Sequence, residues 1–168
     1  MKIICAVIIA CAISFGGPAL AAQNEKINKL KAQILNVQNA GKLGVRDLTL
    51  CRKILGYGSY IPYSGNVIQK GKRAFLYFEP GNIFTSVSKG IYSLSFSEGA
   101  VITDSKGKIV FRNPKMVEFS YSSTKPLFDL FIRNHFSLNA PGEYIFKIVL
   151  YDELRGEKAK AEYAFTIK

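Results

Sequence analysis

The stretch Ala140–Asp152, "APGEYIFKIVLYD", decides the fold class of this chain. A turn signal at its start is followed by an apolar run long enough for a strand. Arg155 and Gly156 mark a second turn, and the stretch "KAEYAFTIK" (160–168) then alternates apolar with polar residues. Such alternation is typical of a half-buried strand. The two stretches therefore predict an antiparallel hairpin at the end of the chain.

Further strand patterns lie upstream of this hairpin. The stretches "IYSLSFS" (91–97) and "MVEFSYS" (116–122) alternate in the same way, whereas "RAFLYF" (73–78) and "YIFKIVLY" (144–151) are apolar on both faces, as central strands are. Turn signals separate the strands at Asp104–Gly107, Asn113–Pro114 and Ala140–Gly142. The pattern predicts about eight short strands in an antiparallel sandwich or barrel.

One local detail favours the sandwich. Gly142 and Tyr144 stand at the start of the long strand, and this resembles the tyrosine corner of immunoglobulin-like domains. The chain has no tryptophan, and Cys51 is its only cysteine beyond the leader, so the disulfide of antibody domains is absent. We therefore expect an all-β, immunoglobulin-like sandwich over residues 48–168.

Residues 22–47 are expected to form an N-terminal helix and a connector. Ile27, Leu30, Ile34 and Val37 recur at spacings of three and four and predict one apolar stripe over residues 23–39. Gly41 follows as a candidate left-handed C-cap residue. We expect this short amphipathic helix to dock on the domain or to pair with a second copy through its stripe.

The first 21 residues are typical of a secretory signal peptide. Lys2 precedes the apolar run Ile3–Phe15, and Ala19–Ala21 is a small-x-small cleavage site. The run has about 13 residues, fewer than the roughly 20 that a membrane-spanning helix needs. We expect cleavage after Ala21 and export to the periplasm or beyond the cell.

The charge of the chain is basic and uneven. Residues 22–73 carry ten Lys or Arg against Glu25 and Asp47, whereas residues 74–168 carry twelve against ten acids. A basic half indicates an anionic partner on one face, although it is also compatible with a solvated surface. Export makes a nucleic-acid partner an unfavourable choice, so we expect an envelope protein, a polysaccharide or an anionic lipid.

The stretch "CRKILGYGSYIPYSG" (51–65) has two interpretations. In the first, its tyrosines form a binding lip among basic neighbours. The residues of this lip are Tyr57, Tyr60, Tyr63, Arg52, Lys53, Lys70, Lys72 and Arg73. In the second, Cys51 is a small buried hydrophobe, Gly56 and Gly58 carry the chain over the end of the sandwich, and the tyrosines cover the edge of the core. We favour the structural role for the cysteine and glycines, and both roles remain open for the tyrosines.

Catalytic and metal sites are poorly supported. Cys51, His135 and Asp129 supply the residue types of a cysteine hydrolase, but the last two are six residues apart, about 20 Å along one extended strand. A single histidine and a single cysteine form no metal-ligand cluster. Four acids could reach calcium in loops, but hairpin turns explain them equally well: Asp104, Asp129, Asp152 and Glu153. We expect no catalytic residue, metal or cofactor.

Three motifs resemble a family of uncharacterised secreted bacterial proteins. The family motifs are a cysteine followed by "GFGxY", the element "LLYxExxNF", and the ending "PGxYxLxLxIxD". They correspond here to "GYGSY" (56–60) after Cys51, "LYFEPGNIF" (76–84) and "PGEYIFKIVLYD" (141–152). The resemblance covers residues 51–168 and implies an exported β-sandwich without a known activity. Together these observations predict an exported, non-enzymatic binding or adaptor protein of the cell envelope. The alternatives are a binder of anionic lipid or polysaccharide through the basic half and, least favoured, a cysteine hydrolase.

Overall fold

The computed structural model describes residues 17–168. The chain divides into two compact units, one ending at Ile34 and one spanning Leu35–Lys168, and each is described by itself. The apolar run Ile3–Phe15 of the predicted signal peptide, with Cys5 and Cys11, lies outside the described residues. Within the described residues, no helix combines the length and apolar character needed to cross a bilayer.

The helix α1 (Gly17–Ala40) is longer than the predicted 23–39. Its predicted apolar stripe is exposed, from 40% at Ile27 to 75% at Val37. In the second unit, Leu35 near the end of the helix is buried, at 4% exposed. Gly41 follows the helix but does not have a positive φ, so the predicted left-handed C-cap is wrong. A Cβ atom at Gly41 would lie 2.5 Å from the Asn82 side chain, and this close approach explains the glycine.

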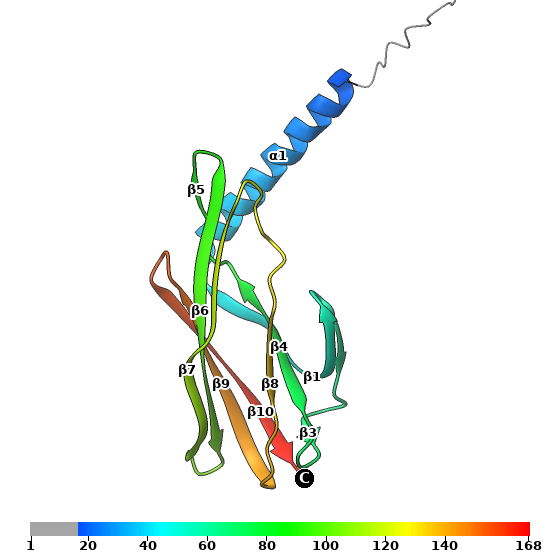
Figure 1. Cartoon of the computed structure of the whole chain (residues 1–168), viewed down its shortest axis with the longest axis vertical. Helices are drawn as coiled ribbons and strands as arrows, with labels where there is room; N and C mark the ends of the chain where they lie inside the picture. Colours follow the sequence, from blue (N-terminus) through cyan, green and yellow to red (C-terminus); the bar gives the residue numbers. More distant parts are fainter. Residues whose placement is uncertain (1–16) are drawn as a thin grey trace, which may run out of the picture. The chain divides into compact units, whose positions relative to one another are not determined.

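The second unit is a β-sandwich of two sheets (Figure 1). Sheet A has the order β2 (Ser59–Pro62), β1 (Gly44–Gly56), β4 (Ala74–Gly81) and β8 (Ile132–Phe136). Sheet B has the order β3 (Val67–Ile68), β10 (Glu157–Ile167), β9 (Gly142–Asp152), β6 (Ile91–Asp104) and β5 (Ser86–Ser88), and β7 (Ile109–Ser123) pairs with β6. All pairings are antiparallel except the short one between β3 and β10. The predicted all-β class with one preceding helix is confirmed.

Alternating residues of both sheets meet in one core. Leu50, Leu76 and Phe78 from sheet A pack with residues such as Ile148 and Leu150 from sheet B, and each of these side chains is at most 1% exposed. Burial of this apolar surface is the main term that stabilises the fold.

The predicted closing hairpin is present. β9 and β10 pair without interruption from Asp152 opposite Glu157 to Gly142 opposite Ile167. The hydroxyl of Tyr144 donates a hydrogen bond to the carbonyl of Ala140 at 2.9 Å, which is the predicted tyrosine corner.

Two sequence predictions are wrong in detail. Asn113–Pro114 is not a turn between strands, because β7 runs through it and the register against β6 shifts there. Proline is tolerated because β7 is an edge strand, where a missing N–H breaks no ladder bond. The single extended strand predicted to contain both Asp129 and His135 is also wrong, because only Ile132–Phe136 is a strand there.

A polar hub fastens the end of α1 to the sandwich within the second unit. The Arg155 guanidinium donates to the carbonyls of Asn39 at 2.8 Å and Asn82 at 2.9 Å. The Asn39 side chain exchanges two hydrogen bonds with the backbone of Thr85, at 2.8 and 2.9 Å. Asp152 is 1% exposed and accepts from three backbone N–H groups around the same hub. The last helical turn is therefore a fixed part of the domain.

Candidate functional site

On the outer face of sheet A, the hairpin of β1 and β2 covers the side chain of Tyr77, which has no exposed surface. After Cys51, β1 no longer pairs with β4 and pairs with β2 instead, and the N–H of Gly58 in the turn that connects β1 and β2 donates to the Tyr77 hydroxyl at 2.8 Å. The ring of Tyr60 packs on Tyr77 with centroids 4.5 Å apart, and Phe131 stacks on it at 5.7 Å. This hairpin is the stretch "CRKILGYGSYIPYSG", and in the fold it shields Tyr77 from solvent.

A carboxylate lies beneath this cover. The Tyr77 hydroxyl donates to Glu79 at 2.6 Å, and the Arg46 guanidinium lies 3.7 Å from the same carboxylate. Burial, and then this hydrogen bond to Glu79, raise the pKa of Tyr77 well above its ordinary value. The pKa of Tyr57 is also raised, by burial and then by the charge of Glu79. The network is internally satisfied, so it holds the hairpin in place.

The three tyrosines of the predicted lip lie in different environments. Tyr57 is 41% exposed in the turn, Tyr60 packs on Tyr77, and Tyr63 packs against the main core. Arg52 lies 5.2 Å above the Tyr63 ring. The five predicted cations are all exposed on β1 and around the turn before β4: Arg52, Lys53, Lys70, Lys72 and Arg73. The structure therefore does not gather the tyrosines into one aromatic lip.

The residues of the hypothetical cysteine hydrolase are not assembled. Cys51 is a free thiol with no exposed surface, and burial raises its pKa to about 11. Cys51 and His135 flank Phe75 on opposite neighbouring strands, which places their backbones about 10 Å apart. Asp129 precedes β8. A thiolate and a base at this separation do not form the hydrogen bond of a catalytic pair.

Two of the four acids considered as calcium ligands, Asp104 and Asp152, hold turns. Asp104 accepts hydrogen bonds from the N–H groups of Lys106 and Lys108, both at 2.9 Å, and Asp152 serves the turn at Arg155. Over residues 17–168 no group of three or more potential ligand side chains gathers at one point.

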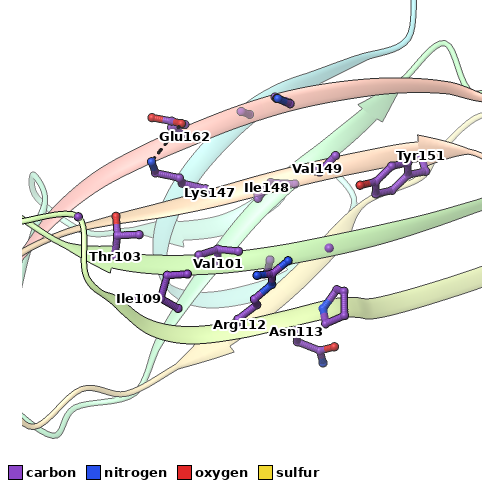
Figure 2. A pocket seen from close by; sticks show the side chains of 16 residues that line it. Val101, Thr103, Ile109, Arg112, Asn113, Lys147, Ile148, Val149, Tyr151 and Glu162 are labelled. Carbon is purple, nitrogen blue, oxygen red and sulfur yellow. Dashed lines mark ion pairs between the residues drawn. The ribbon is translucent and has the colours of Figure 1, made fainter.

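The outer face of sheet B, in contrast, carries an open groove of about 500 Å³ (Figure 2). The pairing registers align its outward side chains in rows across four strands. One row runs from Glu162 on β10 through Lys147 and Val101 to Arg112 on β7. The next row contains Lys160, Val149 and Gly99. We call this surface, bordered further by Tyr151, the sheet B groove.

The groove owes its depth to the bulge at Pro114. Gly99 occupies the row position where a side chain would fill the hollow. A Cβ atom at Gly99 would stand 3.0 Å from the Pro114 carbonyl oxygen, so the bulged strand and the glycine require each other. The floor that remains consists of the half-buried side chains Val101 and Val149.

Cations dominate the rim of the groove. Arg112 and Lys160 are exposed and, among the described residues, take part in no ion pair. Lys147 lies 3.8 Å from Glu162, and both side chains are about half exposed, so water screens this pair (Figure 2). The groove therefore offers an apolar floor, one tyrosine edge and a surplus of positive charge.

Sequence reasoning missed this site because its residues are scattered over four strands. Single strands show alternation but not which outward residues become neighbours, and the rows depend on register. One signal was available: Gly99 inside an apolar strand and Pro114 inside another are typical of a bulge or of close backbone approach.

Comparisons with known proteins add little to this picture. No family model and no curated protein matches the chain. Among solved structures, the alkylpurine DNA glycosylase AlkC of Pseudomonas fluorescens is 16% identical with a TM-score of 0.42 and covers 80% of this chain, which spans 32% of its length. The soluble domain of PmoD from Methylocystis is 14% identical with a TM-score of 0.39, covering 75% of this chain and 90% of its own. These scores are low, and the fold assignment rests on the strands and registers described above.

Proposed function

We propose that this chain is an exported, non-enzymatic binding protein of the cell envelope that holds an extended anionic polymer, such as an acidic polysaccharide, in the sheet B groove. The observation that carries the proposal is the groove itself, with Arg112 and Lys160 at its rim, which form no ion pair with any residue of 17–168.

The geometry supports a linear ligand with repeated negative charge. The rows of side chains cross four strands, so an extended polymer would contact Lys160, Lys147 and Arg112 in succession. Guanidinium groups bind carboxylates with two parallel hydrogen bonds, and ammonium groups add point charge. Tyr151 is 38% exposed and gives a flat ring against which a sugar can pack.

Two further features of the proposal rest on other residues. The non-enzymatic character is supported by the burial of Cys51 and by its separation from His135. Export is supported by the leader pattern of the first 21 residues, and the resemblance to the secreted family agrees with it. Both features remain parts of the proposal.

Cosedimentation with alginate, an acidic polysaccharide, tests the groove directly. We expect binding at low salt that weakens at physiological salt, because screened charges carry it. The double variant Arg112→Gln/Lys160→Gln should lose most of this binding.

The matched control is Lys53→Gln/Lys72→Gln, which removes the same charge from the basic residues outside the groove. Equal loss in both variants would move the site to the basic half of the chain, or reduce it to net charge. Absence of binding to alginate at low salt would reject the proposed ligand class.

A further inference from the structure

A second cavity, separate from the sheet B groove, opens at the side of the sandwich. β8 is an edge of sheet A and β7 is an edge of sheet B, and the two strands do not pair with each other. A cavity of about 340 Å³ lies between them. We call it the lateral slot, and its walls are apolar side chains from both sheets: Ile102, Phe111, Met116, Phe136, Leu138 and Phe146.

The slot leads from an exposed aromatic mouth to the core. Phe111 at the mouth is 38% exposed, which is unusual for a side chain that faces the interior side of its strand opposite Ile102. Ile102 and Phe146 at the floor are 2% and 1% exposed. Phe136 packs against Phe146 with ring centroids 5.4 Å apart. An apolar chain entering at Phe111 would therefore continue the existing core packing and remove the exposed ring from water.

The rim of the slot has a cationic corner. Arg73 and His135 line the slot, and both are exposed. Arg73 has no ion-pair or hydrogen-bond partner among the described residues, and no aspartate or glutamate lines this slot. A cation beside an apolar cavity without a counter-charge is complementary to a ligand with one apolar chain and one anionic end.

We propose that the lateral slot binds a fatty acid, with its hydrocarbon chain between Phe111, Met116 and Phe136 and its carboxylate at Arg73 and His135. The volume of the slot falls within the range of small-molecule sites, and the fork of Arg73 suits a carboxylate. The lateral slot and the sheet B groove are different surfaces with different proposed ligands, so each can be tested without the other.

Displacement of a dansyl-labelled fatty acid by dodecanoate, measured by fluorescence on the full domain, tests the apolar part of the slot. Phe111→Asp should abolish saturable binding, because it places a charge in the mouth. Val110→Asp is the matched control, since Val110 is the preceding residue on β7, is 43% exposed and does not line the slot. Binding that survives Phe111→Asp, or that is lost equally in both variants, would overturn the proposal.

The charged part of the slot is tested with Arg73→Gln, a surface change that leaves the apolar walls intact. We expect it to weaken dodecanoate about tenfold, the usual scale of a hydrogen bond to a charged group, and to leave the uncharged dodecanol nearly unchanged. Equal effects on the acid and the alcohol would overturn the assigned position of the carboxylate. Absence of saturable binding of the labelled fatty acid to the unmodified protein would reject the site as a whole.

Discussion

The two outer faces of the sandwich differ in what covers them. On sheet A, the β1–β2 hairpin covers the outward side chain of Tyr77, which has no exposed surface. Sheet B leaves its outward side chains open, and its Tyr151 is 38% exposed at the edge of a groove. The same residue type therefore supports the fold on one face and is available to a ligand on the other. The difference shows that an aromatic side chain with charged neighbours indicates binding only where the chain leaves it uncovered.

Replacing Tyr77 and Tyr151 separately by alanine tests whether the two tyrosines differ in their contribution to stability. Tyr77→Ala removes the ring between Tyr60 and Phe131 and the hydroxyl that holds Gly58, so we expect a loss of about 3–5 kcal/mol in the free energy of unfolding. Tyr151→Ala on the open face should change it by about 0.5 kcal/mol or less. Chemical denaturation of both variants measures the difference.

Comparable losses in the two variants would mean that Tyr151 also serves the fold, and the groove would lose its proposed aromatic edge. A small loss for Tyr77→Ala would mean that the hairpin is not fastened through this ring. Either result removes the contrast between the two faces.

The β9–β10 hairpin of sheet B could be predicted from the sequence, whereas the contact of the β1–β2 hairpin with Tyr77 on sheet A could not. The β9–β10 hairpin and the Tyr144 corner follow from the apolar run of residues 144–151, from the alternation of residues 160–168 and from the turn residues beside them. β1 continues through Cys51 to Gly56, but no local pattern of the sequence indicates that the following hairpin contacts Tyr77. That contact depends on bulges at Cys51–Lys53 and Ile54–Gly56, which are set by tertiary packing.

The groove was unpredictable for a related reason. Arg112, Lys147 and Lys160 are unremarkable exposed cations in their own strands. They become one surface only because β7, β6, β9 and β10 pair in the observed registers. Register is decided by the whole hydrophobic pattern, and a shift of one residue would turn these side chains into the core.

A buried carboxylate, Glu98, lies in the core between the two sheets. Asn134 of sheet A donates a hydrogen bond to Glu98 of sheet B at 2.5 Å in the core. Glu98 has no exposed surface, its second carboxylate oxygen has no hydrogen-bond partner among residues 17–168, and burial raises its pKa to about 7. Because the folded state holds this proton more tightly than the unfolded state, the contribution of Glu98 is fully present below about pH 4.5 and is lost as pH rises through 7.

We expect this loss to be about 3 kcal/mol between pH 4.5 and pH 8, the free energy that corresponds to raising the pKa from its ordinary value of 4.5 to about 7. Glu98→Gln keeps the acceptor for Asn134 but does not titrate, so its unfolding free energy should lack this component. Denaturation curves at several pH values give the comparison. Parallel pH profiles for the two proteins would show that Glu98 is not neutral in the folded interior.

The tyrosine corner at Tyr144 gives a smaller expected effect on stability. Tyr144→Phe removes only the hydroxyl that donates to Ala140, so we expect a loss of about 1 kcal/mol, the net value of one hydrogen bond. Ligand binding in the sheet B groove should be unchanged, because Tyr144 faces the core side of β9. An unaltered unfolding midpoint would remove the structural role of the tyrosine corner.

The smallest effect on stability is expected at the open face itself. Glu162 and Lys147 form an exposed pair at 3.8 Å, and such pairs contribute about 0–1 kcal/mol. Glu162→Gln should therefore leave the free energy of unfolding nearly unchanged.

The same change removes the one carboxylate that lines the groove and releases Lys147, so binding of alginate should become stronger and more sensitive to salt. Glu118→Gln is the control, because it removes an equally exposed carboxylate that pairs with Lys115 outside the groove. Stronger binding in Glu162→Gln alone places the ligand in the groove, whereas equal gains in both variants would reduce the open face to a general effect of net charge.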